Sequence, residues 1–96
     1  MTYRFTSGAD QDLSVALQYY EEAQEGLGAR FLDDLEEAIR RVVSMPFAWK
    51  PLSPRTRRCL FHRFPFAIIY QVRGEEIVIV AVADLRRDPA RLELLK

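Results

Sequence analysis

The chain has 96 residues, of which 49% are hydrophobic and 29% are charged, and its formal net charge is zero. This length accommodates one domain, residues 1–96, and the composition is typical of a folded protein and not of a disordered one. Because Cys59 is the only cysteine, an internal disulfide and a cysteine-based zinc site are excluded. The N-terminus has no apolar stretch of signal-peptide length, and no segment reaches the roughly 20 apolar residues that cross a bilayer. We therefore expect a cytoplasmic protein.

The charges are divided unevenly along the chain. Residues 1–48 carry four basic and nine acidic side chains, a net charge of −5, and residues 49–96 carry ten basic and five acidic ones, a net charge of +5. A basic second half suits nucleic acid or an acidic partner, whereas the acidic first half would repel nucleic acid. Charge alone does not decide between a nucleic acid and an acidic protein as the partner.

The chain begins with a short alternating stretch and an amphipathic helix. Residues 3–6 alternate as a strand does, and Ser7 followed by Asp10 resembles an N-terminal helix cap. Apolar side chains then recur at steps of three and four residues, which predicts a helix over residues 9–24. Its apolar face comprises Leu13, Ala16, Leu17, Tyr20 and Ala23, and its solvent face comprises Asp12, Gln18, Glu21 and Glu22.

A second helix is predicted after the short connection that contains Gly26 and Gly28. Residues 31–43 carry an apolar stripe at helical spacing, and Pro46 ends the helix. The proline-rich residues 47–57 should form no regular structure.

Three strand-like runs follow, at residues 58–62, 66–73 and 77–82, separated at Pro65 and Gly74. In the second run, the even-numbered side chains form a strongly apolar face and the odd-numbered face becomes polar towards its end. Gly74 can adopt the positive φ of a tight hairpin, so the second and third runs should pair antiparallel. The third run, IVIVAV, is apolar on both faces, which is typical of a central strand or of a docking face.

The predicted fold class is α+β. It consists of an N-terminal strand, a helical hairpin, and then a three-stranded antiparallel meander that forms one small sheet with the helices packed on one face. Because the helices cover only one face, the other should carry an exposed apolar patch, and such patches mark partner sites.

Candidate catalytic chemistry is sparse. The sequence has no phosphate-binding glycine loop and no cluster at metal-ligand spacing, so we expect no cofactor and no metal. His62 is interpreted as a solvated or packed strand residue in preference to a catalytic base, because no acidic neighbour is fixed beside it. Cys59 is interpreted as a core residue in preference to a nucleophile.

Basic residues are more informative than the histidine or the cysteine. One group precedes and enters the sheet and a second follows its last strand, and the two could converge; they are Lys50, Arg55, Arg57, Arg58 and Arg63, and Arg86, Arg87 and Arg91. Each of these residues could equally be a solvent-exposed side chain at the edge of the sheet that is loosely paired with an acid. The turn at residues 86–89 is the strongest candidate for a contact surface, because it is short, charged and follows the last strand.

Two segments carry a resemblance to a known family: RFPFAIIY at residues 63–70 and ADLRRDP at residues 83–89. Together with Arg57-Arg58, the N-terminal strand and the acidic helical hairpin, they resemble the RelE/ParE superfamily of bacterial toxins from type II toxin-antitoxin modules. The resemblance covers nearly the whole chain and is greater to the ParE branch, whose members are often labelled plasmid stabilisation proteins. One departure is Asp84, where many members have a histidine.

The resemblance implies one of two activities. RelE-like members cleave mRNA on the ribosome with basic residues and a C-terminal tyrosine, and ParE-like members inhibit DNA gyrase by binding it. Here Ala67 stands where the nuclease branch has an arginine, Leu60 falls near the position of a catalytic lysine, and the tail has Arg91 and not the tyrosine. The resemblance therefore implies a gyrase or topoisomerase inhibitor with no catalytic residues. The alternatives are a ribosome-dependent endoribonuclease that uses Arg57, Arg58 and Arg63, and a non-toxic binding relative.

The resemblance also implies two partners, and these give the candidate site residues. Contact with the target is expected at Arg86, Arg87, Asp88 and Pro89. A cognate antitoxin segment that folds on binding is expected to form a hetero-oligomer with this chain. Its contacts are expected at Tyr19, Tyr20, Arg57, Arg58, Phe64, Arg86 and Arg87.

Overall fold

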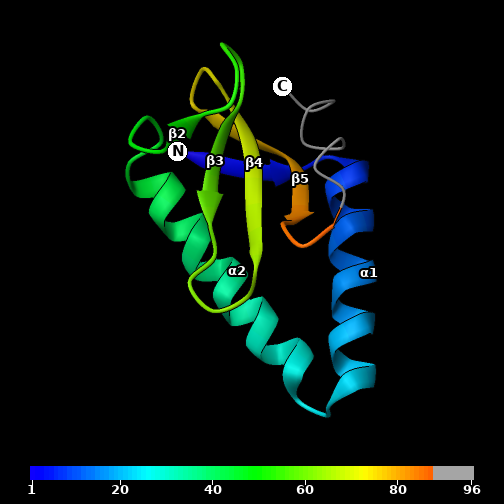
Figure 1. The fold of residues 1–96 in the computed structure, drawn as a ribbon. Coiled ribbons are helices and arrows are strands. Elements are labelled where there is room, and N and C mark those ends of the chain that lie inside the picture. The colour runs from blue at the N-terminus through cyan, green and yellow to red at the C-terminus, as the bar shows by residue number, and fades with distance from the viewer. Residues whose placement is uncertain (88–96) are drawn as a thin grey trace.

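The computed structural model describes residues 1–87, so Asp88, Pro89 and Arg91 lie outside the described residues. Two helices, α1 (Ser7–Ala23) and α2 (Leu27–Ser44), form the predicted hairpin. Figure 1 shows them as a V that closes at their short connection, with α2 packed against β3 and β4 and with α1 beside β5.

The connections of the hairpin differ in detail from the prediction. The N-cap of α1 is Thr6, one residue before the predicted Ser7, and its Oγ1 accepts the backbone N–H of Ala9 at 3.2 Å. Gly26 precedes α2 with φ of +87°, a conformation that few other residues adopt. Glu21 was assigned to solvent, yet its carboxylate accepts the backbone N–H groups of Gly26 and Gly28, which lower its pKa.

The sheet has five strands in the order β1-β5-β4-β3-β2: β1 (Thr2–Phe5), β2 (Lys50–Pro51), β3 (Arg57–Leu60), β4 (Phe66–Arg73) and β5 (Glu76–Asp84). The predicted α+β class and antiparallel meander are confirmed. Two features were not predicted: β1 pairs parallel with β5, and β2 forms within the proline-rich stretch that was predicted to be irregular. The first depends on pairing with a strand more than 70 residues away, and the second is a two-residue strand that forms only by pairing with β3. Local periodicity reveals neither pairing.

A β-bulge explains why IVIVAV is apolar throughout. Ile69 pairs with Ala81 but Tyr70 pairs with Ile79, so Val80 is the extra residue on β5. The bulge reverses the alternation: Ile77, Ile79 and Val82 all join the core under the helices. Simple alternation would have placed Val82 on the opposite face.

The opposite face of the sheet carries a smaller apolar cluster. Ala67, Ile69, Ala81 and Ala83 form it, with Leu52, Val80 and Leu85 packed against it. The first four are at most 4% exposed, so the predicted exposed apolar patch is wrong for them. Three of the four are alanines, whose side chains are small, so the three larger neighbours Leu52, Val80 and Leu85 suffice to cover much of their surface.

Asp34 of α2 anchors the loop between β3 and β4 and was missed in the sequence. It is buried, and its carboxylate accepts the backbone N–H groups of His62 (3.1 Å), Arg63 (2.8 Å) and Phe64 (2.9 Å). These bonds satisfy loop donors that would otherwise be unpaired. The signal was available, because Asp34 lies on the apolar stripe three residues after Phe31, where an acid requires a buried partner.

Candidate functional site

A pocket of about 150 Å³ lies between α1 and the end of β5, and we call it the α1–β5 pocket. Its apolar walls are Val15, Ala16, Tyr19, Phe66 and Val82, and its charged lining residues are Asp12, Asp84, Arg86 and Arg87. Val15 and Tyr19 are each 50% exposed. The mouth of the pocket therefore combines accessible apolar surface with charge.

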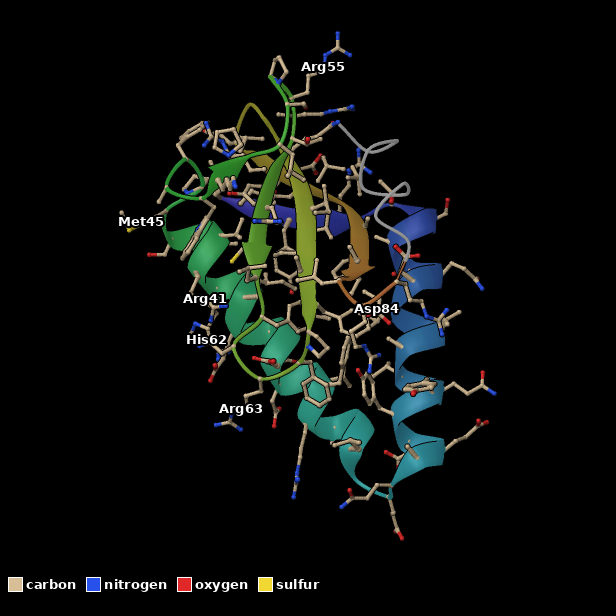
Figure 2. The ribbon with its side chains drawn as sticks, in the orientation of Figure 1. Arg41, Met45, Arg55, His62, Arg63 and Asp84 are labelled. Carbon is tan, nitrogen blue, oxygen red and sulfur yellow. The ribbon has the colours of Figure 1, made fainter. Side chains whose placement is uncertain are left out.

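Asp84, which Figure 2 labels at the end of β5, contacts the two arginines of this pocket, Arg86 and Arg87. Its carboxylate accepts the backbone N–H of Arg86 at 3.0 Å and the Nε and Nη2 of Arg86 at 3.1 Å each, and Arg87 Nε lies 3.5 Å away. Burial alone would raise the pKa of Asp84, but the hydrogen bonds from Arg86 and the charges of Arg86 and Arg87 lower it overall. The turn is therefore fixed by an ionised carboxylate.

Aromatic rings lie beneath one of these arginines, Arg86. The guanidinium carbon of Arg86 lies 5.8 Å from the ring centroids of both Tyr19 and Tyr20, a cation–π arrangement. Tyr20 is 7% exposed, and its ring contacts those of Phe31 and Phe64 at 5.5 and 4.8 Å. Of the three predicted aromatic contacts, Tyr19 is exposed, Tyr20 is buried in the core, and Phe64 is partly buried and packs against the core.

The remaining predicted basic residues lie elsewhere. Arg57 donates to the carbonyl oxygens of Phe47 (3.1 Å) and Trp49 (2.9 Å), so its guanidinium fixes the loop after α2. Arg58 of β3 pairs with Ile69 of β4 and is partly buried. Figure 2 shows Arg55 beyond one end of the strands and Arg63 in the loop at their other end. The described basic residues therefore do not converge on one surface.

The fold and this pocket can be compared with known proteins. A family model described as the ParE toxin of the type II toxin-antitoxin system parDE matches residues 3–89. The chain belongs to this ParE toxin family. The resemblance that was inferred from the RFPFAIIY and ADLRRDP segments is thereby confirmed.

A solved structure supports the same fold. The chain is similar, at 22% identity, to a chain of the chromosomal ParDE toxin-antitoxin system from P. aeruginosa. The match covers 88% of this chain and 96% of that one, with a TM-score of 0.76. At this identity the likeness establishes the fold alone. No curated protein sequence matches the chain.

Within this ParE-family chain, neither His62 nor Cys59 has the surroundings of a catalytic group. His62 is exposed, and its Nδ1 lies 3.5 Å from the guanidinium of Arg41. Cys59 is buried, and burial raises the pKa of its thiol although the charge of Arg41 opposes this. The interpretation of Cys59 as a core residue is confirmed. His62 is solvated, as one of the two interpretations had it, but it lies in the loop after β3 and not in a strand.

A second surface, which was not predicted, lies between β1 and the C-terminal half of α2, and we call it the β1–α2 groove. Its volume is about 580 Å³, and it is lined by Met1, Tyr3, Glu36, Ile39, Arg40, Val43 and Ser44. Met1 and Tyr3 are about half exposed. The signal in the sequence was weak, because it required knowing that the start of β1 lies near the C-terminal half of α2.

Other classes of site were searched for in the described part of the chain. Within residues 1–87, no group of three or more His, Cys, Asp or Glu side chains could hold a metal ion. In the same residues no helix is both long and apolar enough to span a membrane.

Proposed function

We propose that this protein is a toxin that inhibits DNA gyrase by binding it through the α1–β5 pocket, and that a cognate antitoxin neutralises it. Membership of the ParE toxin family supports the toxin role. The observation that carries the mode of action is the pocket itself, in which exposed Val15 and Tyr19 lie beside Arg86 and Arg87. We place its action in the cytoplasm, where gyrase acts on DNA.

The pocket has the composition of a protein-protein contact. Aromatic residues and arginines are enriched at such contacts and supply much of their affinity. Asp84 and the rings of Tyr19 and Tyr20 hold Arg86 in one position, so little side-chain entropy is lost when a partner binds. The neighbouring Asp88 and Pro89 stay predicted target contacts.

The arrangement of the basic residues gives less support to the endoribonuclease alternative. Cleavage of a phosphodiester needs several cationic groups around one phosphate and a group that moves a proton. Arg57 is engaged by two loop carbonyls, and Arg63 lies at the opposite end of β3. A nuclease that uses Arg57, Arg58 and Arg63 would have to bring these residues together.

A gyrase assay tests the proposal. The purified protein should inhibit DNA supercoiling or stabilise gyrase-cleaved DNA, and normal supercoiling at excess protein would refute the target but not the family. Primer extension on mRNA after induction tests the alternative, because new codon-phased 5′ ends would indicate a nuclease. Normal growth after induction of folded protein would indicate a non-toxic relative.

We further propose that the antitoxin contributes a disordered segment that folds on this protein and covers the pocket. Acidic residues of the segment would pair with Arg86 and Arg87, and its apolar residues would contact Tyr19. Calorimetry should show a large negative heat-capacity change with weak salt dependence. A steep salt dependence with little heat-capacity change would contradict an apolar contact.

A further inference from the structure

The charges in the middle of the chain are all of one sign. Residues 38–74 contain eight basic side chains and no acidic one. Most of this stretch forms the end of α2 and the strands β2, β3 and β4. This part of the protein should therefore attract polyanions.

Three of these cations meet at one end of the sheet. Arg55 and Arg57 line a hollow of about 100 Å³, and Arg55 and Arg73 line a second one of about 360 Å³. The two hollows also share Pro54 and Val72, so they adjoin and form one surface, which we call the basic end. Figure 2 shows Arg55 beyond the strands at this end. Of the predicted basic residues only Arg55 and Arg57 line it, and Arg73 was not among those predicted.

The arginines of the basic end project from a fixed backbone. Ser53 Oγ accepts the backbone N–H groups of Arg55 at 3.1 Å and of Thr56 at 3.0 Å, which fixes the tip of the β2–β3 hairpin. The bonds of Arg57 to two loop carbonyls both use Nη1. Within residues 1–87 its other two guanidinium nitrogens make no hydrogen bond, so they are available to a phosphate oxygen.

Acids do not neutralise these arginines. In the α1–β5 pocket, by contrast, Asp84 pairs with both arginines, and Asp12, which had been assigned to solvent, accepts the N–H of Val82 at 3.0 Å. Within residues 1–87, no acid lines the basic end and none of its three arginines forms an ion pair. A polyanion would therefore meet uncompensated positive charge there.

An exposed aromatic ring lies beside the arginines. Phe47 is 65% exposed, although the guanidinium carbon of Arg57 lies 5.4 Å from its ring centroid. It lines the same hollow as Arg55. A base can stack on such a ring when it is not already stacked inside a duplex, so arginines beside an exposed ring suit a single strand. The side chains of an acidic peptide, Glu and Asp, have no ring to stack on Phe47.

We propose that the basic end binds a single-stranded nucleic acid, with phosphates on its three arginines and one base stacked on Phe47. The site binds the strand without cleaving it, because within residues 1–87 no histidine, lysine, tyrosine, cysteine or carboxylate lines it to move a proton. It tolerates any sequence, since phosphate contacts and stacking do not read the edges of bases. The site is separate from the α1–β5 pocket, with which it shares no lining residue, and so it goes beyond the proposed function.

Titration of short fluorescent oligothymidylate and oligouridylate probes with the purified protein tests this inference. The logarithm of the binding constant should fall with the logarithm of the salt concentration with a slope of about −2, because three contacts to a single strand contribute about 0.7 each. Binding of either probe supports the proposal, and a preference between them identifies DNA or RNA as the strand. Tighter binding of a DNA duplex of the same length, or binding of neither probe at low salt, would overturn it.

Three variants and a matched control locate the site. Arg55→Ala and Arg73→Ala should each weaken binding about fivefold and reduce the salt slope by about 0.7. Phe47→Ala should weaken binding about tenfold with the slope unchanged, and Phe47→Tyr should retain the affinity. Arg63→Ala is the control, because Arg63 is exposed and lies at the other end of the strands, and it should leave the affinity nearly unchanged. Equal losses in Arg63→Ala and Arg55→Ala would refute the site.

A polyglutamate probe of the same charge separates recognition of a nucleic acid from recognition of charge alone. It should bind more weakly than the oligonucleotides, and Phe47→Ala should not change its affinity. Equal binding of polyglutamate, together with unchanged oligonucleotide affinity in Phe47→Ala, would make an acidic protein segment the ligand and overturn the proposal. The replaced side chains are exposed, so thermal unfolding of the variants should match that of the wild type.

Discussion

The α1–β5 pocket and the β1–α2 groove differ in what they offer a partner. The pocket is small, and its arginines are fixed by Asp84 and by tyrosine rings. The groove is nearly four times larger, at about 580 Å³ against about 150 Å³, and it lies beside β1, an edge strand of the described sheet. The pocket should therefore supply orientation and association rate, and the groove should supply buried area and affinity.

We expect the antitoxin to cover the exposed apolar lining of the groove as well as the pocket. The largest expected effect is therefore that of a charge placed in the groove. Tyr3→Asp should weaken antitoxin binding about 100-fold, close to 3 kcal/mol, because a carboxylate would lie against the apolar surface of Ile39 and Val43. Inhibition of gyrase should change less than twofold, since the pocket and the groove share no lining residue. Calorimetry of the complex and a supercoiling assay measure the two effects. Equal losses in both assays would show that the surfaces are not separate.

Val15→Asp is the matched change in the pocket, because Val15 and Tyr3 are both 50% exposed. It should weaken gyrase inhibition about tenfold or more, by placing a carboxylate on the apolar wall near Asp84. Antitoxin affinity should fall less than in Tyr3→Asp, because the groove contact remains. Thermal unfolding of both variants checks that the fold is intact. Full gyrase inhibition by Val15→Asp would exclude this pocket as the target site.

Arginines at the two surfaces should differ by a smaller amount. Arg87 of the pocket and Arg40 of the groove are equally accessible, with side chains 68% and 69% exposed. Arg87→Ala should slow association with the antitoxin about fivefold at low salt, an effect of about 1 kcal/mol that salt screens. Arg40→Ala should have little effect, because Glu36 and Glu37 neighbour it. Stopped-flow measurements at two salt concentrations give the association rate of each variant with the antitoxin. Equal slowing by Arg87→Ala and Arg40→Ala would contradict the prediction.

The sequence predicted the pocket better than the groove, and the reason is physical. Arg86 and Arg87 stand in a recognisable segment, and Tyr19 was named with them as an expected antitoxin contact; all three line the pocket. The parallel pairing of β1 with β5 joins residues more than 70 positions apart, for example Thr2 and Glu76, and no local pattern reports such a pairing. The bulge at Val80 likewise made both faces of β5 look apolar in the sequence. This led to the incorrect prediction of an exposed apolar patch on the second face of the sheet.

An effect of similar size to that of Arg87→Ala concerns pH and the fixed geometry of the pocket. The pKa of Asp84 is lowered in the folded protein by Arg86 and Arg87, so its stabilising contribution is present above its unfolded pKa, about 3.9, and is lost as the pH falls through the folded pKa. Asp84→Asn keeps an acceptor oxygen but removes the charge, and should destabilise the protein by about 1 kcal/mol. The difference in unfolding free energy between wild type and Asp84→Asn should therefore stay constant from pH 8 to pH 5 and shrink below about pH 4. Denaturant unfolding across this range measures it, and a difference that vanished between pH 8 and pH 5 would mean that Asp84 is not held ionised by the two arginines.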